Sequence, residues 1–176
     1  MPQAPKRFIT IDQAPGMIGW FDIKDRGFIE PLDKAFNVQD IRDSADRLIK
    51  IVEREIKLLN GEGKRVFVGG MSQGAAMAEI TGLQVKQKIG GVVAAAGYFF
   101  NITEISENNL DTPFVAFHGA KDFLVPWDIV KGPYEDLKKR KPNNTEVILL
   151  DYMGHDFDQE AIREKFREVI EKALKA

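Results

Sequence analysis

The chain alternates short, nearly continuous apolar segments with segments whose apolar residues recur every three or four positions. Continuous apolar segments predict strands that are buried on both faces, and the periodic segments predict amphipathic helices. The expected strands cover residues 65–70, 90–99, 112–119 and 145–152, and the expected helices cover residues 38–59, 73–88, 127–140 and 158–176. Because strands that alternate with helices favour a mostly parallel sheet flanked by helices, we predict an α/β fold.

We expect residues 1–176 to form a single domain, because 176 residues suffice for one core and no long linker or internal repeat divides them. The first 35 residues are rich in Pro, Gly and aromatic residues and are expected to be irregular. Residues 7–11 are the one β-prone stretch in that region.

Composition excludes several classes of function. The chain has 25 basic and 27 acidic residues, so it has no basic footprint for nucleic acid. It has no cysteine and two histidines, which excludes disulfides, thiolate chemistry and cysteine-based metal sites and makes a structural zinc site unexpected. No apolar run reaches the length of a membrane span, and the N-terminus lacks the apolar core of a signal peptide. A cytoplasmic location is therefore the expectation.

Residues 70–74 read Gly-Met-Ser-Gln-Gly, a G-x-S-x-G pattern between an expected strand and an expected helix. That context is typical of a nucleophile elbow, in which a sharp turn exposes the serine hydroxyl. Side chains at Gly70 and Gly74 are expected to clash in so tight a turn, and the N-terminus of the following helix would stabilise a developing oxyanion. The alternative is that the small residues only let a helix pack closely on the sheet.

A nucleophilic serine needs a base, and the chain offers only His118 and His155. His118 ends an apolar strand, where a packed structural imidazole is expected. His155 lies in a loop between the last strand and the last helix, after the flexible Gly154. We therefore favour His155, because loops at the carboxyl end of a parallel sheet carry catalytic groups.

The third residue should be an acid that follows a late strand and orients the imidazole. Asp122 follows the strand that ends at His118 and is the favoured candidate. Asp151 and Asp156 are weaker candidates, because they lie close to His155 in sequence. Asp128 is also weaker, because it fits better as a partner of a helix N-terminus. The order serine, aspartate, histidine is the one expected of an α/β-hydrolase.

Several motifs resemble the phospholipase/carboxylesterase family of α/β-hydrolases, which includes acyl-protein thioesterases and lysophospholipase-like esterases. They are spread over nearly the whole chain and read "PQAPKRFITI", "GWFDI", "VGGMSQGAAMA", "AAAGYF", "FHGAKDFLVP" and "YMGHDF". The resemblance implies that Ser72 is the nucleophile, Asp122 the acid and His155 the base. It further implies that the backbone N–H of Gln73 is an oxyanion-hole donor and that Trp20 helps to shape the acyl site.

Members of that family hydrolyse carboxylic esters or thioesters through an acyl-serine intermediate, without cofactor or metal. The resemblance therefore implies an acyl ester or thioester substrate for this chain. Met71, Phe99, Phe100 and Met153 have side chains that suit an acyl chain, although each is equally compatible with a place in the core.

The resemblance fails at the start of the chain, because the family's earlier strands and its HGxGD-like loop have no counterpart before Met1. We thus expect an N-terminally truncated α/β-hydrolase. That loop supplies the second oxyanion N–H, and loss of one such donor costs about 10²–10³ in rate. We also expect an exposed edge near Val66–Val68, covered by a second protein chain, either another copy or a different subunit. The alternative function is that of a hydrolase-derived structural subunit with weak or no turnover.

Overall fold

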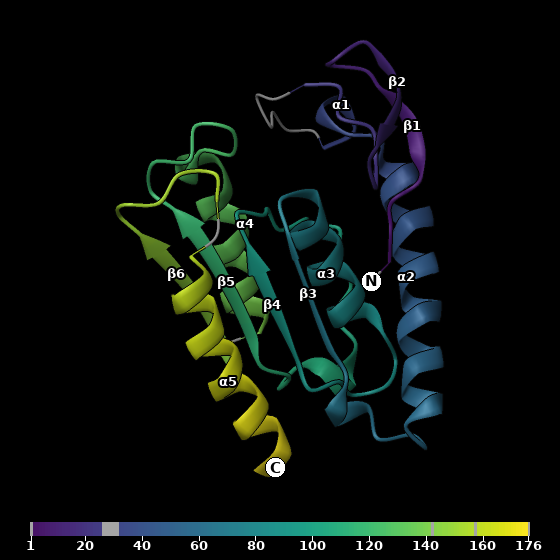
Figure 1. The fold of residues 1–176 in the computed structure, drawn as a ribbon, viewed down its shortest axis with the longest axis vertical. Coiled ribbons are helices and arrows are strands. Elements are labelled where there is room, and N and C mark those ends of the chain that lie inside the picture. The colour runs from purple at the N-terminus through teal and green to yellow at the C-terminus, as the bar shows by residue number, and fades with distance from the viewer. Residues whose placement is uncertain (1, 26–31, 142, 157, 176) are drawn as a thin grey trace.

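The computed structural model describes residues 2–25, 32–141, 143–156 and 158–175. Its main sheet has four parallel strands in the order β3-β4-β5-β6, and Figure 1 shows this arrangement. The strands are β3 (Phe67–Met71), β4 (Gly91–Ala95), β5 (Phe114–Gly119) and β6 (Thr145–Leu150). The α/β fold predicted from the sequence is confirmed.

Four long helices alternate with these strands and cover both faces of the sheet (Figure 1). They are α2 (Val38–Leu58), α3 (Gln73–Gln84), α4 (Trp127–Arg140) and α5 (Gln159–Lys175). The larger core cluster joins the sheet to α2, α3 and α4, whereas α5 packs on the other face through Val169, Ile162 and Ala161. Helix α3 is buried almost all round, because it lies between the sheet and α2.

Two elements end earlier than the sequence predicts. The helix expected over residues 73–88 stops at Gln84, because the side-chain amide of the buried Asn109 donates to the carbonyls of Val85 and Gln87. The strand expected over residues 90–99 stops at Ala95, since Ala96 adopts a positive φ of 49°. The other expected helices and strands of the sheet agree with the structure to within about two residues, the ordinary scatter of element boundaries.

The N-terminal region is more regular than expected. Strands β1 (Lys6–Ile9) and β2 (Ala14–Ile18) form an antiparallel hairpin, and the short helix α1 (Leu32–Ala35) precedes α2. Strand β2 has no alternation of apolar and polar residues, because it contains Pro15 and Gly16 and is mostly exposed. Figure 1 shows the hairpin above α2, beyond the main sheet.

Strand β3 is the end strand of the sheet, with β4 as its single partner among the described residues. The N–H of Ser72 donates to Ala95 at 3.0 Å, and alternate residues of a parallel strand face the same neighbour. The backbone groups of Phe67, Gly69 and Met71 therefore face the open edge. The exposed edge predicted near Val66–Val68 is thus present.

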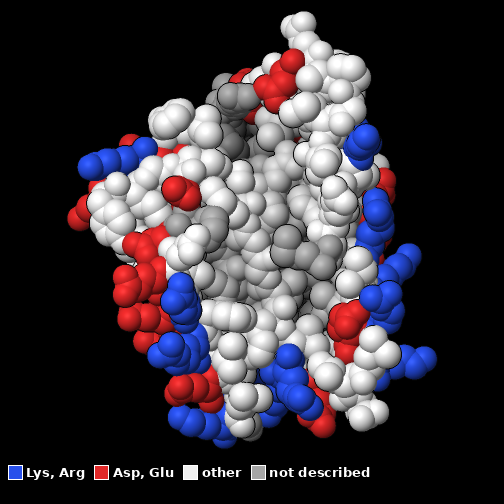
Figure 2. All heavy atoms as spheres, viewed as in Figure 1, with Lys and Arg blue, Asp and Glu red and all other residues white. Residues whose placement is uncertain are grey.

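Apolar hollows flank this edge on both faces of the sheet. One, of about 440 Å³, lies between β3, α2 and α3, and the other, of about 450 Å³, lies between β3, β4 and α5. Figure 2 shows the second face: its centre is recessed and, among the described residues, without charge, and charged side chains line its two flanks.

None of the helices in the described ranges is long and apolar enough to cross a membrane.

Candidate active site

The G-x-S-x-G segment forms a strained strand-to-helix turn at the carboxyl end of β3. Ser72 has φ 54° and ψ −123°, a backbone conformation that side-chain-bearing residues rarely adopt. A Cβ on Gly70 would lie 2.2 Å from the carbonyl oxygen of Gly74, so no side chain fits at position 70. The clash expected at Gly74 is absent, because its nearest neighbour would be the indole Nε1 of Trp20 at 4.0 Å.

Ser72, His155 and Asp122 form one continuous hydrogen-bonded chain. The Oγ of Ser72 lies 3.0 Å from Nε2 of His155, and Nδ1 of His155 lies 2.8 Å from Oδ2 of Asp122. The three residues follow β3, β6 and β5, so the carboxyl edge of the sheet brings together residues far apart in sequence. The three side chains therefore have the mutual geometry that a serine hydrolase requires of its nucleophile, base and acid.

The loop after β5 holds the carboxylate of Asp122 rigidly. Its Oδ1 accepts from the backbone N–H groups of Leu124 at 3.0 Å and Val125 at 2.8 Å, which leaves Oδ2 for the imidazole. A Cβ on Gly119 would lie 2.2 Å from the carbonyl oxygen of Met153, so the acid loop and the histidine loop meet only because residue 119 is glycine. Asp122 is buried and can stabilise an imidazolium without competition from water.

His118, the other histidine, lies beneath this loop and outside the hydrogen-bonded chain. Its Nε2 is 2.8 Å from the carbonyl oxygen of Val125, so this nitrogen carries the proton and donates. Burial lowers the pKa of His118, which keeps the imidazole neutral. As expected of a packed histidine, it is fully buried, and it supports the turn that holds Asp122.

The N-terminus of α3 lies next to the serine. Gln73 is the first residue of this helix, and N–H groups of a first helical turn have no acceptor within the helix. They carry the positive end of the helix dipole and are suited to bind an oxyanion.

In the described part of the chain, no group of three or more His, Cys, Asp or Glu side chains is arranged to hold a metal ion.

Two of the side chains expected at the acyl site, Trp20 and Met71, line the hollow of about 440 Å³ beside the elbow. Phe99 lines a different hollow of about 230 Å³, between the segment after β4 and α4. Met153 is buried in the histidine loop, and its carbonyl accepts from the N–H of Lys121. Phe100 lines the same hollow as Phe99. The structure therefore gathers two of these five residues at the elbow and places the other three elsewhere.

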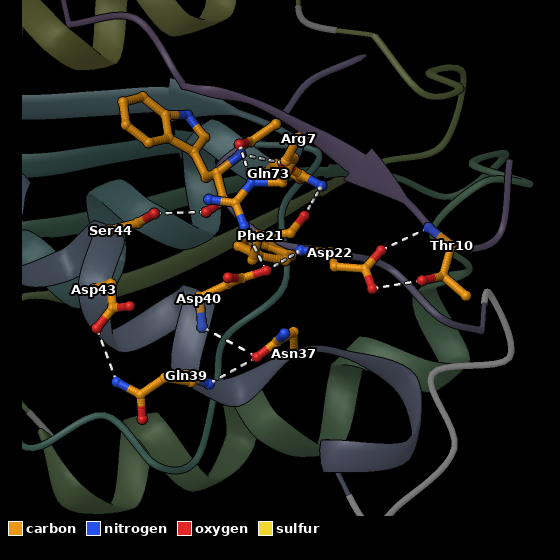
Figure 3. Close-up of polar contacts among 12 residues, drawn as sticks. Arg7, Thr10, Phe21, Asp22, Asn37, Gln39, Asp40, Asp43, Ser44 and Gln73 are labelled. Atoms are coloured by element: carbon orange, nitrogen blue, oxygen red, sulfur yellow. Dashed lines mark hydrogen bonds and ion pairs between the residues drawn. The ribbon is translucent and has the colours of Figure 1, made fainter. Parts of the chain in front are cut away.

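Sequence reasoning missed the side chain of Gln73. Its amide binds the backbone of the segment that carries Trp20: Oε1 accepts from the N–H of Trp20 at 2.9 Å, and Nε2 lies 3.2 Å from the carbonyl oxygen of Phe21 (Figure 3). The motif "GWFDI" marked this segment but gave no sign of a partner on α3. Such a contact spans 53 residues and depends on the folded chain.

A parallel sheet with a serine elbow at one strand end, and an acid and a histidine in loops after later strands, defines an α/β-hydrolase. The model of the phospholipase/carboxylesterase family matches residues 1–173. The chain belongs to this family, as the sequence motifs predict.

Curated relatives carry the name acyl-protein thioesterase 1. The protein from Gibberella zeae is 31% identical over 146 residues, which cover 78% of this chain and 61% of the relative. The homolog 1 from Dictyostelium discoideum is 31% identical over 167 residues, which cover 92% and 70%. The chain spans about three fifths of the first of these relatives.

Solved structures agree on the fold. Arabidopsis thaliana SOBER1 superposes with a TM-score of 0.84 at 21% identity, over 98% of this chain and 82% of that chain. Zea mays acyl-protein thioesterase 2 gives a TM-score of 0.74 at 20% identity, over 98% and 80%. Both likenesses concern the arrangement of helices and strands.

Proposed function

We propose that this chain is a serine hydrolase that cleaves carboxylic esters or thioesters through an acyl-serine intermediate. The observation that carries the proposal is the unbroken hydrogen-bonded chain from Ser72 through His155 to Asp122. Membership of a family whose relatives are named acyl-protein thioesterases supports it.

In the first half of the proposed reaction, Oγ of Ser72 attacks the acyl carbonyl while Nε2 of His155 accepts its proton across 3.0 Å. Asp122 then stabilises the imidazolium through the proton on Nδ1. The backbone N–H of Gln73 donates to the developing oxyanion at the helix N-terminus. When the tetrahedral intermediate collapses, the alcohol or thiol leaves with the proton from His155.

In the second half, water attacks the acyl-serine, and His155 serves as the base and then returns the proton to Ser72. The acyl group would occupy the end of the hollow of about 440 Å³ that lies beside the elbow, where Trp20, Met71 and Gly74 line it. Substrate contacts by Phe99 and Met153 stay predictions, as does the cytoplasmic location.

A fluorophosphonate probe, which reacts with activated serines, tests the proposal directly. We expect labelling of the purified chain at Ser72, none in Ser72→Ala, and a reduction of about 10³-fold or more in the labelling rate of Asp122→Asn, because an asparagine favours the wrong imidazole tautomer. A circular dichroism spectrum of each variant serves as the control for folding. Absence of labelling in a folded chain would contradict an activated serine.

The free edge of β3 favours one further candidate function, that of a hydrolase-derived subunit in a larger assembly. In this case the site at Ser72 would hydrolyse substrate weakly or not at all. Labelling that depends on a partner would indicate a site completed by assembly, whereas a folded assembly that never labels would favour the structural role.

We also propose that an extended segment of a different protein chain pairs with this edge. The outward backbone groups of β3 require a strand. Apolar side chains of that strand would occupy the hollow beside α2 at the end lined by Ile51 and Val66, away from the elbow, and the hollow on the opposite face of the sheet. Glu55 is the one charged residue among those that line the hollow beside α2, so an uncharged strand with a basic end is complementary. A second copy does not fit: α2 borders the hollow and α3 packs on β3, so α2 of one copy would meet α3 of the other if two β3 edges paired.

A lysine-flanked peptide of consecutive valines is the probe for this strand, because its side chains are apolar on both faces. We expect it to slow amide exchange at Phe67, Gly69 and Met71 by tenfold or more, with no effect from the same peptide carrying proline at alternate positions. Ile51→Lys, within the hollow, should abolish the protection, and Leu58→Lys, at an exposed position of the same helix, should not. Protection of these amides without peptide, together with a doubled mass, would show that a second copy is the partner and overturn the proposal.

A further inference from the structure

The side chain of Gln73 joins the nucleophile elbow to the segment that walls the acyl site. Its amide oxygen accepts from the N–H of Trp20 and its amide nitrogen donates to the carbonyl of the next residue, Phe21. Gln73 directly follows Ser72, so any shift of this side chain acts on the residue that also carries the proposed oxyanion donor.

Residues 19–22, here called the strap, lie outside every strand of the structure, and side chains satisfy most of their backbone (Figure 3). Nε of Arg7 donates to the carbonyl of Gly19 at 2.7 Å, and Oγ of Ser44 donates to the carbonyl of Trp20 at 2.5 Å. Oδ2 of Asp40 accepts from the N–H of Asp22 at 3.0 Å and also pairs with Arg7. The strap is therefore held by side chains from the hairpin, α2 and α3 at once.

Within the strap, neighbouring side chains have opposite environments. Phe21 is fully buried and makes edge-to-face contacts with Phe36, Tyr98 and Phe100. Trp20 is half-buried and lines the hollow next to Met71. The aromatic cluster fixes the depth of the strap, and the amide of Gln73 is the contact that fixes its position relative to the elbow.

We infer that the Gln73 side chain is a positioning residue that sets acyl-chain specificity by holding Trp20 at a fixed distance from Ser72. This inference rests on the proposed function. The backbone of Gln73 binds the oxyanion, and its side chain holds the wall of the acyl site, so one residue fixes both ends of the bound acyl group. Loss of the side-chain amide releases Trp20 and leaves the backbone donor in place.

Gln73→Met removes both hydrogen bonds at nearly constant volume and without charge. We expect amide exchange at Trp20 to accelerate tenfold or more, because the acceptor of that N–H is lost. We expect kcat/KM for an octanoyl p-nitrophenyl ester to fall about tenfold further than kcat/KM for the acetyl ester, mainly through KM, because only the longer chain reaches Trp20.

Two variants separate positioning from a general structural effect. Gln84→Met makes the same exchange at the other end of α3 and should change neither quantity. Ser44→Ala releases the strap from α2 and should shift the ratio of the two esters in the same direction as Gln73→Met. Equal losses for both esters in Gln73→Met, or unchanged exchange at Trp20, would overturn the inference. If the unsubstituted chain hydrolyses neither ester, the proposed function fails, and exchange at Trp20 still decides whether Gln73 holds the strap.

Discussion

At the scale of single residues, the two histidines illustrate how environment assigns a role. His155 is partly exposed and has hydrogen-bond partners on both ring nitrogens, Ser72 and Asp122. His118 is buried, its Nε2 is hydrogen-bonded to a carbonyl, and its Nδ1 has no hydrogen-bond partner among the described residues. The first arrangement suits proton transfer, and the second suits support of the acid loop.

We expect His118→Ala to lower the free energy of unfolding by about 2–4 kcal/mol, because it removes a buried hydrogen bond and leaves a cavity. His155→Ala should change the free energy of unfolding by less than about 1 kcal/mol and abolish probe labelling. Urea unfolding and labelling of both variants check this division. A large loss of stability in His155→Ala would show that both histidines are structural.

At the scale of elements, helix α3 carries most of the tight constraints. Its first residue follows a strained serine, and its middle carries Glu79, which is fully buried. The hydroxyl of Tyr134 donates to Oε1 of Glu79 at 2.8 Å, yet burial raises the pKa of Glu79 to about 8. The helix therefore holds a carboxylic acid that is protonated at neutral pH.

The two glycines of the elbow should respond differently to alanine. We expect Gly70→Ala to cost about 3 kcal/mol or more, because its Cβ would lie 2.2 Å from a backbone oxygen that cannot move without unwinding α3. Gly74→Ala should change stability by less than about 1 kcal/mol, since its Cβ has room beside Trp20. Urea unfolding of both variants decides, and equal costs would contradict the geometry of the turn.

Glu79 predicts a specific pH dependence of stability. The unfolded chain releases this proton near pH 4.5 and the folded chain near pH 8, so the unfolded state binds fewer protons in between and stability falls as pH rises. Glu79→Gln keeps an acceptor for Tyr134 and cannot ionise. As the pH rises from 4.5 to 8, we expect the free energy of unfolding of the variant to increase relative to that of the unsubstituted chain, by on the order of 4 kcal/mol at most. A difference independent of pH in urea unfolding would contradict the raised pKa.

For the whole molecule, periodicity was sufficient to predict the parallel sheet and its helices. The candidates Ser72, Asp122 and His155 came from the G-x-S-x-G pattern and from the positions of an acid and a histidine after later strands. Hydrophobic pattern determines elements of this length, and parallel strands necessarily place their carboxyl ends at one edge. Strand β1 agrees with the β-prone stretch predicted over residues 7–11, but β2 and its pairing with β1 were not predicted, because β2 is short and mostly exposed. The early end of α3 was missed for another reason: it depends on Asn109, a residue distant in sequence. That residues 1–176 form one domain stays a prediction.

The proposed function requires that Ser72 becomes acylated during turnover. The most direct measurement is peptide mass spectrometry of the chain quenched with acid within seconds of mixing with an octanoyl thioester. We predict one octanoyl group on the peptide that contains Ser72, and none in Ser72→Ala. Hydrolysis of the thioester with no acyl group on that peptide, or an equal adduct in Ser72→Ala, would contradict the account.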